Sequence, residues 1–306
     1  MGWKRYPFEE LAFCEGGPIM TGDNEPKRWI GPLFEVPADF VEPAPHPVES
    51  KERFYQAIIN GFKRIMRAQG LRFYVHGAEN LPERDGALLV INHTGYYDFI
   101  IAGIGAHLQG KRLVRFMAKK EVFDTKIVGA LMRGMKHVPV DRAAGADSIA
   151  EATKWLSGGG LVGIFPESTI SRSFELAEFK TGAVRIADEA GVPMIPTVIW
   201  GSQRIWTKGI PKNLGRSHTP IVLSYGEPVY TTGDAEKDTR RVKAAMQELL
   251  ERNRAEYARR FGPFEPGQRW MPAALGGSAP TLAEATAIQQ KEREARLAKK
   301  QAKKQG

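Results

Sequence analysis

The sequence predicts an α/β fold, in which a mostly parallel twisted sheet is flanked by helices. Short apolar segments alternate along the chain with longer segments of helical periodicity. Two of the short segments, 87–91 and 161–165, are almost wholly apolar, as expected of strands that helices cover on both faces. The chain has 306 residues, of which 42% are hydrophobic and 26% charged, which is typical of one large globular domain with extensions.

The N-terminal segment, residues 1–49, is predicted to be a proline-rich arm outside the main domain. It contains eight prolines and little periodicity, which indicates an extended segment lying over the domain or a partly disordered one. We therefore expect the domain itself to begin near residue 50.

The first regular element of the domain is a predicted amphipathic helix over residues 51–69. Phe54, Ile58 and Phe62 recur at four-residue steps, and most basic residues of the segment lie on other sides of the helix. Such a helix suits an anionic membrane surface, with the apolar side chains entering the interface. Ordinary packing against the domain is the alternative.

Seven strands are predicted after this helix, each from a short segment that is apolar or rich in β-branched and aromatic residues. They are residues 71–77, 87–91, 114–118, 136–140, 161–165, 194–200 and 221–226. Helices are predicted where apolar residues recur at three- and four-residue steps. These are residues 97–108, 121–134, 146–157, 180–190 and 235–260. Strands separated by helices imply a mostly parallel sheet with helices on both faces.

The predicted domain spans residues 50–265 and is followed by a basic C-terminal tail, residues 266–306. The end of this tail favours helix but has only a thin apolar stripe. We therefore expect a solvated segment that is partly disordered.

The net charge of +9 is unevenly distributed along the chain. Residues 1–49 carry −5, residues 281–306 carry +4, and the segment between them carries +10. A basic domain makes nucleic acid, anionic lipid head groups and phosphorylated small molecules candidate partners. No recognised nucleic-acid-binding motif is present, so we expect no nucleic-acid partner.

Several targeting and redox features are not found in the sequence. Cys14 is the one cysteine, which excludes an intrachain disulfide and fits a reducing compartment. The basic N-terminus is not followed by the apolar segment of a secretory signal. The longest apolar run, Phe99–Ala106, is far shorter than the roughly 20 residues of a membrane-spanning helix. No group of metal ligands is evident, and we expect no metal and no cofactor.

A histidine and a carboxylate follow the predicted strand 87–91 directly. Asn92 and His93 come at its carboxyl end, and Asp98 opens the next helix. In a parallel sheet the ligand crevice lies at this edge. A carboxylate bonded to one imidazole nitrogen leaves the other nitrogen to act as a general base. A histidine and an aspartate with this spacing also occur by chance. The evidence for a catalytic pair is therefore mainly its position at the end of a strand.

A polar segment follows the strand 161–165 in the same way. Glu167 comes first, then Ser168 and Thr169, with Arg172 close behind. The arginine and the hydroxyls can hold a phosphate. A solvated loop, or a serine or threonine cap on the next helix, is the alternative.

Three further cations lie at or just after strand ends. They are Lys120, Arg142 and Lys180. Together with Arg172 they would surround the same crevice with positive charge. Each of them taken singly is more often an ordinary surface cation.

Four ordered blocks of the sequence resemble those of the glycerolipid acyltransferases, the 1-acylglycerol-3-phosphate acyltransferase family. "NHTGYYD" is similar to the Asn-His-x4-Asp block of that family. "AKKEVFD" with "KHVPVDR", "FPESTISRSF" with "FKTGA", and "VPMIPTVI" resemble the second, third and fourth blocks. The blocks follow in the family order over roughly residues 70–230, which is far more specific than any single block.

The resemblance implies transfer of an acyl chain from acyl-CoA or acyl carrier protein to a glycerolipid hydroxyl. His93 would take the proton from the attacking hydroxyl, and Asp98 would orient His93. Glu167 would bind acceptor hydroxyls. The acceptor phosphate would be held by Lys120 and Arg172, with Arg142 as a weaker candidate. The remaining predicted binding residues are Asn92, Ser168, Thr169 and Lys180.

The third block departs from the family pattern at two positions. The family usually has glycine where this chain has Ser168, and arginine where it has Ile170. The missing arginine is a lost phosphate ligand that Arg172 can replace. We expect lysophosphatidic acid as acceptor, with glycerol 3-phosphate, a glycolipid or another lysolipid as alternatives. A non-catalytic lipid-binding protein is the alternative from another class.

The acceptor and the product of such a reaction reside in the bilayer. The resemblance therefore implies a peripheral enzyme at the cytoplasmic face of the plasma (inner) membrane, with an anionic membrane surface as partner. The sequence does not indicate an oligomeric state.

Overall fold

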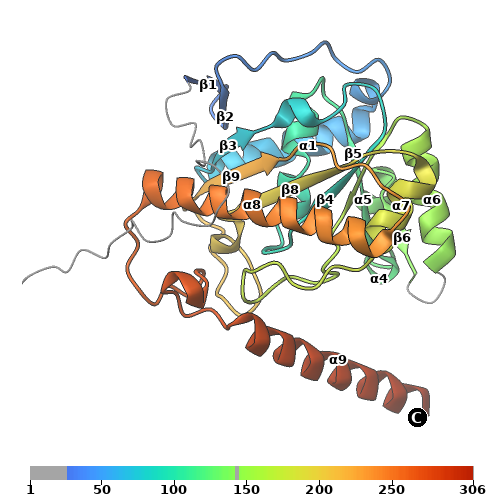
Figure 1. Ribbon diagram of the computed structural model, residues 1–306, viewed down its shortest axis with the longest axis vertical. Helices are drawn as coiled ribbons and strands as arrows, with labels where there is room; N and C mark the ends of the chain where they lie inside the picture. The colour runs from blue at the N-terminus through green and yellow to red at the C-terminus, as the bar shows by residue number, and fades with distance from the viewer. Residues whose placement is uncertain (1–25, 142–144, 306) are drawn as a thin grey trace, which may run out of the picture.

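The computed structural model describes the backbone of residues 26–141 and 145–305. In this part of the chain, nine strands form one sheet in the order β1-β2-β3-β9-β8-β4-β7-β5-β6 (Figure 1). The strands are β1 Lys27–Ile30, β2 Phe34–Pro37, β3 Arg72–His76, β4 Ala87–Ile91, β5 Val114–Lys119, β6 Val138–Val140, β7 Leu161–Ile164, β8 Met194–Trp200 and β9 Pro220–Tyr225.

The sheet is mostly parallel, which confirms the predicted fold class. Two neighbouring pairs are antiparallel, β1 with β2 and β8 with β9. The five strands β8, β4, β7, β5 and β6 are parallel to one another, so their carboxyl ends lie at one edge. The remaining strands run in the other direction or lie at the far side of the sheet. This parallel block therefore gives the fold one edge at which several loops meet.

Helices flank the sheet on both faces. The α-helices of the described residues are α1 Arg53–Ala68, α2 Asp98–Ile101, α3 Ile104–Leu108, α4 Lys120–Phe123, α5 Lys126–Gly134, α6 Gly145–Ser157, α7 Gly182–Ala190, α8 Ala235–Phe261 and α9 Leu282–Gln305. One core contains side chains of α1, α2 and α3, and the other contains side chains of α6, α7 and α8. Strand β4 serves both, because Leu89 and Ile91 join the first core and Leu88 and Val90 the second.

Two predicted helices are each divided in the structure. The segment 97–108 forms α2 and α3, because the Tyr225 hydroxyl is inserted at the break: it accepts from Gly105 N at 2.7 Å and donates to Ala102 O at 2.9 Å. The segment 121–134 forms α4 and α5. Thr125 caps α5 by accepting a hydrogen bond from Gly129 N. Both breaks depend on local side-chain bonds that periodicity does not reveal.

The segment 51–69 is helical, but two of its apolar residues do not face outward. Ile58 and Phe62, for which entry into a membrane interface and packing against the domain were both considered above, line an apolar cavity with Lys63. Phe54 and Ile65 are the exposed large apolar residues of α1, at 48% and 49% exposure. The side of α1 that contains Ile58 and Phe62 is therefore its packed side.

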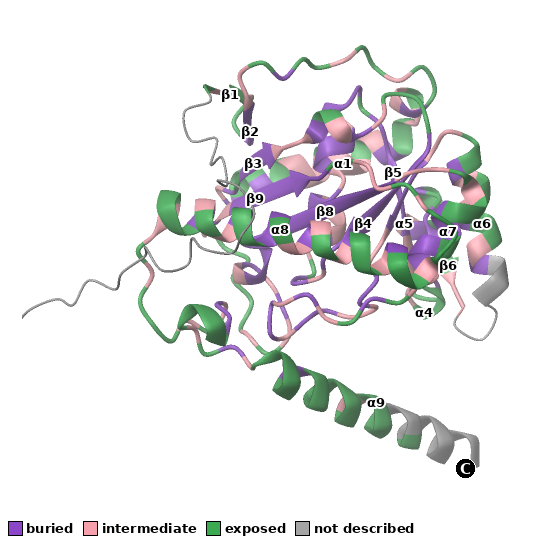
Figure 2. Ribbon diagram, viewed as in Figure 1, coloured by how far each residue is buried: buried purple, intermediate pink, exposed green. Residues whose placement is uncertain are grey.

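The two terminal segments contain regular structure. Within the N-terminal arm, β1 and β2 extend the sheet beside β3, with Leu33 O accepting from Phe73 N. No strand was predicted there. Within the C-terminal tail, α9 lies apart from the sheet layers and is mostly exposed along its described side chains (Figure 2). Among the described helices, none is long and apolar enough to cross a membrane.

Candidate active site

The loops after β4, β7 and β8 meet at the carboxyl edge of the parallel block. The β4 loop carries His93 and leads to Asp98 at the start of α2. The β7 loop carries Glu167, and the β8 loop carries Ser202. Because β4 lies between β7 and β8 in the sheet, these three loops are neighbours in space. The arrangement brings together residues more than 100 positions apart in the sequence.

His93 and Asp98 form a hydrogen-bonded pair. Nδ1 of the imidazole lies 2.9 Å from Oδ2 of the carboxylate. The same oxygen accepts from the backbone amides of Thr94 and Gly95, at 2.7 Å each. Asp98 is fully buried, whereas the His93 side chain is 21% exposed. The carboxylate is thus held by the turn that separates the two residues, and the ring reaches the surface of the site.

Ser202 completes the surroundings of Asp98 and was not predicted from the sequence. Its hydroxyl donates to Asp98 Oδ1 at 2.5 Å and lies 3.1 Å from Thr94 Oγ1. Gly201 before it has φ +110°, and a Cβ there would lie 2.5 Å from Pro220 O, so the turn requires glycine. The "GS" directly after the apolar strand 194–200 is the sequence signal that could have indicated it.

The hydrogen bonds determine what the imidazole can do chemically. A carboxylate only accepts, so Nδ1 carries the proton and Nε2 has a free lone pair. The ring stacks at 4.3 Å between centroids on Phe165, at a tilt of 31°. An imidazole oriented in this way can take a proton from a hydroxyl at Nε2 while Asp98 stabilises the resulting cation.

Glu167 joins the β4 and β7 loops. Its Oε1 accepts from His93 N at 3.0 Å, and its Oε2 accepts from Ala177 N at 3.1 Å. Ser171 N in turn donates to His93 O at 2.7 Å. Burial raises the pKa of the Glu167 carboxyl to about 8, although the two amide hydrogen bonds oppose this shift. Glu167 therefore positions the backbone of His93 from a nearly enclosed site.

The raised pKa of Glu167 predicts a pH-dependent contribution to stability. The folded state holds this proton more tightly than the unfolded state, whose carboxyl keeps its ordinary pKa of 4.5. The contribution is complete below pH 4.5 and is lost as the pH rises through about 8. We expect the free energy of unfolding of the wild type, relative to Glu167→Gln, to fall by up to about 1.4 kcal/mol per pH unit in this window.

Urea denaturation of both proteins at pH 5, 7 and 9 measures this difference. The glutamine leaves one amide donor without an acceptor, which lowers stability by a constant amount at every pH. A difference between the two proteins that does not change with pH would contradict the raised pKa.

The other predicted binding residues of the β7 loop follow Glu167 in the sequence. Ser168 has φ +60°, a conformation that glycine adopts most readily. Thr169 accepts a hydrogen bond from Lys208 Nζ at 2.5 Å. Ile170 is buried, and Arg172 forms an ion pair with Glu292 of α9. The position at which the family has arginine therefore packs into the protein, and two cations lie beside it.

The other predicted binding residues are placed differently. Asn92 is buried, and its amide bridges to β8: Nδ2 donates to Ile199 O at 3.0 Å and Oδ1 accepts from Ile199 N at 2.8 Å. Lys180 is exposed before α7. Lys120 forms an exposed ion pair with Asp141, at 3.2 Å. Arg142 lies outside the described residues. Asn92 thus joins the carboxyl end of β4 to β8.

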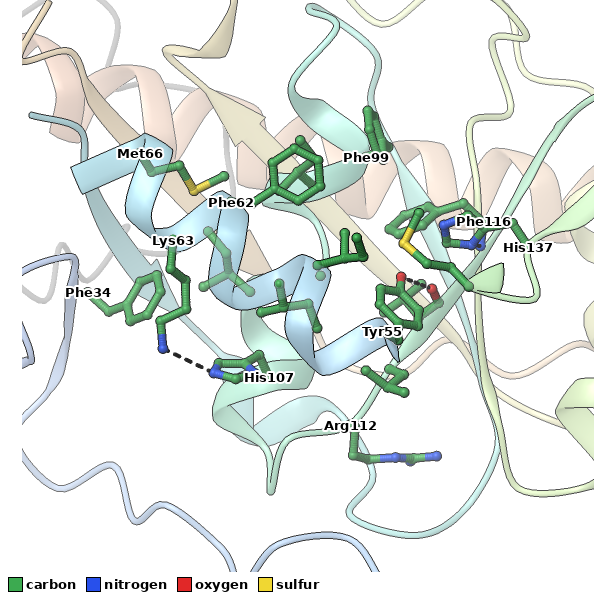
Figure 3. Close-up of a pocket in the computed structure, with 18 residues that line it drawn as sticks. Phe34, Tyr55, Phe62, Lys63, Met66, Phe99, His107, Arg112, Phe116 and His137 are labelled. Carbon is green, nitrogen blue, oxygen red and sulfur yellow. Dashed lines mark hydrogen bonds between the residues drawn. The ribbon is translucent and has the colours of Figure 1, made fainter. Parts of the chain in front are cut away.

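An apolar cavity lies between α1, α3 and β5 on one face of the sheet (Figure 3). It has an empty volume of about 610 Å³, part of which is open to solvent. Phe116 lines it and stacks at 6.4 Å on Phe165, which contacts His93. Burial lowers the pKa of His107 to about 4 and that of His137 to about 3, so both imidazoles are neutral at pH 7. Sequence reasoning did not find this cavity.

Comparison with known proteins gives three findings. A family profile described as Acyltransferase matches residues 72–200. The 1-acyl-sn-glycerol-3-phosphate acyltransferase of Bacillus subtilis is 32% identical over 200 residues, which cover 64% of this chain and 92% of that protein. The chloroplastic 1-acyl-sn-glycerol-3-phosphate acyltransferase LPAT1 of Arabidopsis thaliana is 26% identical, over 56% of this chain and 48% of that protein. The chain thus spans about half the length of the plant relative.

A solved structure is also similar to this chain. The crystal structure of the 1-acyl-sn-glycerophosphate (LPA) acyltransferase PlsC from Thermotoga maritima is 23% identical, with a TM-score of 0.48. The similarity covers 65% of this chain and 88% of that one.

Proposed function

The chain belongs to the acyltransferase family that contains the 1-acyl-sn-glycerol-3-phosphate acyltransferases, and we propose that it acylates the free hydroxyl of lysophosphatidic acid. The donor is a thioester, acyl-CoA or acyl carrier protein, and the products are phosphatidic acid and the free thiol. The observation that carries this proposal is the hydrogen bond from His93 Nδ1 to the buried Asp98. It supplies an oriented base at the edge of the sheet where ligands bind.

In the proposed reaction, Nε2 of His93 removes the proton of the acceptor hydroxyl as its oxygen attacks the thioester carbonyl. The tetrahedral intermediate then expels the thiolate, and the imidazolium returns the proton to the sulfur. Asp98 stabilises the transient charge on His93. A general base in this position is worth about 10²–10⁴ in rate. No metal and no covalent acyl-enzyme is needed for this sequence of steps.

We place the acyl chain of the donor in the apolar cavity. Its lining is supplied by aliphatic and aromatic side chains of α1, α3 and β5, including Ile58, Phe62 and Ile104. Phe116 and Phe165 connect it with the His93 ring by successive ring contacts. Burying an alkyl chain there is favourable by about 0.8 kcal/mol for each methylene group.

We propose that the acceptor phosphate binds at the β7 loop, where Arg172 and Thr169 lie. Lys120 and Lys180 are exposed cations that can contribute to attracting it. Glu167 is engaged at both oxygens by backbone amides, so its proposed role is to position His93 rather than to bind the acceptor hydroxyl.

An acceptor screen tests the proposed function. Thiol release from palmitoyl-CoA and from palmitoyl-loaded acyl carrier protein is followed with purified protein. The acceptors are detergent-dispersed lysophosphatidic acid, glycerol 3-phosphate and a phosphate-free lysolipid. We expect release with lysophosphatidic acid, and loss of this release in His93→Ala. Release with only one of the other acceptors would identify that compound as the substrate instead. Such a result would agree with the presence of Ile170 where the family usually has arginine. No release with any acceptor, from either donor class, would contradict the proposal.

We further propose that α1 contacts an anionic membrane surface through its exposed side. This side contains the apolar residues Phe54 and Ile65 and the exposed cations Arg53, Arg64 and Arg67. Reversing Arg64 and Arg67 to glutamate should weaken binding to anionic vesicles about tenfold or more, because each cation near such a surface is worth about 1 kcal/mol.

Cosedimentation with vesicles that contain anionic phospholipid measures this effect. Arg240→Glu with Arg252→Glu is the matched control, because both residues are exposed on α8, which belongs to the opposite core. The two double variants have the same net charge. Equal binding by both of them would contradict the proposed orientation.

A further inference from the structure

A small second pocket lies where α9 meets the β7 loop. It is lined by Thr169, Ile170, Ser171, Arg172, Ala177 and Lys208, and from α9 by Leu282, Ala285, Thr286, Gln289 and Glu292. Three segments therefore meet here: the loops that follow β7 and β8, and the C-terminal helix. Figure 1 shows α9 on the side of the molecule where these loops lie.

The residues that precede two cations of this pocket, Arg172 and Lys208, are hydrogen-bonded to the backbone around His93. Ser171, which precedes Arg172, donates from its amide to His93 O at 2.7 Å. Thr207, which precedes Lys208, donates from its hydroxyl to Thr94 O at 2.6 Å. Each cation is thus one residue away from a short hydrogen bond to the loop of the proposed base. Their positions relative to that base are determined by the fold rather than by a flexible loop.

Polar groups from different loops converge between these cations. Lys208 Nζ donates to Thr169 Oγ1 at 2.5 Å, so the ammonium lies over the β7 loop. The Arg172 guanidinium forms its ion pair with the Glu292 carboxylate. Guanidinium, ammonium and hydroxyl are the donors that bind a phosphate monoester. In this structure the carboxylate of Glu292 is the anion that Arg172 binds.

The helix that supplies this carboxylate buries few of its described side chains. Of the described side chains of α9, Ala285 alone is buried, while Leu282 and Ile288 are 40% and 37% exposed. The Arg172 and Glu292 side chains are themselves 24% and 34% exposed, and partly solvated ion pairs contribute little to stability. An incoming dianion of higher charge can therefore displace Glu292.

We propose that Lys208, with Arg172 and Thr169, binds the phosphate monoester of the acceptor, and that Glu292 of α9 competes with that phosphate for the same site. This inference rests on the proposed function, because it names the residues that select a phosphorylated acceptor. Lys208 supplies the second cation of a site in which residue 170 is a buried isoleucine. Helix α9 then covers the site until the acceptor enters.

Binding of inorganic phosphate to the full-length protein tests the site without any turnover. The dissociation constant is measured by the phosphate-dependent shift in Tm at constant ionic strength. We expect Lys208→Met to weaken binding about tenfold, since a charge-assisted hydrogen bond is lost, and Glu292→Gln to tighten it several-fold. Lys208→Arg should restore most of the binding.

Two control variants make the same substitutions, Lys to Met and Glu to Gln, at residues outside the pocket. Lys212 is exposed in the same loop, with its ammonium 4.2 Å from the Trp206 ring centroid, and Lys212→Met should bind phosphate as the wild type does. Glu294 is exposed on α9, where it accepts from Gln290 at 3.2 Å, and Glu294→Gln should also bind as the wild type does. If Lys208→Met binds phosphate with the same affinity as Lys212→Met, the role of Lys208 is overturned. Glu292→Gln and Glu294→Gln with equal affinity would overturn the competition.

Kinetics with two acceptors separate this inference from the proposed function. Lys208→Met should raise the KM for lysophosphatidic acid about tenfold and leave the KM for a monoacylglycerol unchanged. If the phosphate affinities change as expected but lysophosphatidic acid is not acylated, the site stands and the proposed acceptor is wrong. If lysophosphatidic acid is acylated and Lys208→Met keeps the wild-type KM, the proposed function stands and the inference is overturned.

Discussion

Replacing His93 with alanine is expected to lower turnover by about 10²–10⁴ or more, because the attacking hydroxyl then has no positioned base. The fold should be preserved. The ring is partly exposed, and Asp98 keeps its hydrogen bonds from the two amides and from Ser202. The expected signature is therefore loss of kcat at nearly unchanged free energy of unfolding.

Thiol release and urea denaturation, measured on the same preparation, provide this test. His76→Ala is the matched control: His76 also pairs with a carboxylate, Glu256 at 2.8 Å, but it belongs to β3 on the other part of the sheet. That variant should retain turnover. If His93→Ala keeps more than about a tenth of the wild-type turnover, His93 is not the general base.

Asp98→Asn is the second change with a large expected effect, up to about 10²–10⁴ in kcat, the range that a positioned general base contributes. The amide oxygen can still accept from His93 and from the two backbone amides, and the amide nitrogen can donate to Ser202, whose hydroxyl rotates. The shape of the site is thus kept. What is lost is the negative charge that stabilises the imidazolium formed during the reaction.

Ser202→Ala separates charge from hydrogen bonding in this cluster. It removes one hydrogen bond from Asp98 Oδ1 and leaves the aspartate itself in place. We expect turnover to fall by about 10- to 100-fold, since one hydrogen bond to a charged group is worth about 1.5–3 kcal/mol and the bonds to Oδ2 remain. If Asp98→Asn and Ser202→Ala lower kcat equally, the charge of Asp98 has no special role.

The regular elements of the domain could be predicted from the sequence to within a few residues. Strands 87–91 and 194–200 have the predicted bounds, and the predicted helix 235–260 is observed as Ala235–Phe261. The two strands are short apolar segments of the length typical of buried strands, and the helix is long enough for its periodicity to identify it. The position of His93 and Asp98 followed from the same reasoning, because both are defined by the end of one strand.

Elements that depend on distant partners were not predicted. Strands β1 and β2 have no local signal of their own and form by pairing with each other and with β3. The break between α2 and α3 depends on the Tyr225 hydroxyl, which arrives from β9. What covers the apolar side of α1 was left open between a membrane and the domain, because periodicity identifies an apolar side but not its partner.

The sequence by itself determined the fold class, the order of the elements and the strand ends at which His93, Asp98 and Glu167 lie, because local periodicity and strand termini are written in consecutive residues. Only the tertiary structure decided which residues from distant segments contact this part of the molecule. Ser202 reaches Asp98, Lys208 reaches Thr169 and Glu292 reaches Arg172 across large sequence separations. The first two contacts arise because the order of the parallel strands places the loops after β4, β7 and β8 side by side, and the third arises because α9 packs beside the β7 loop.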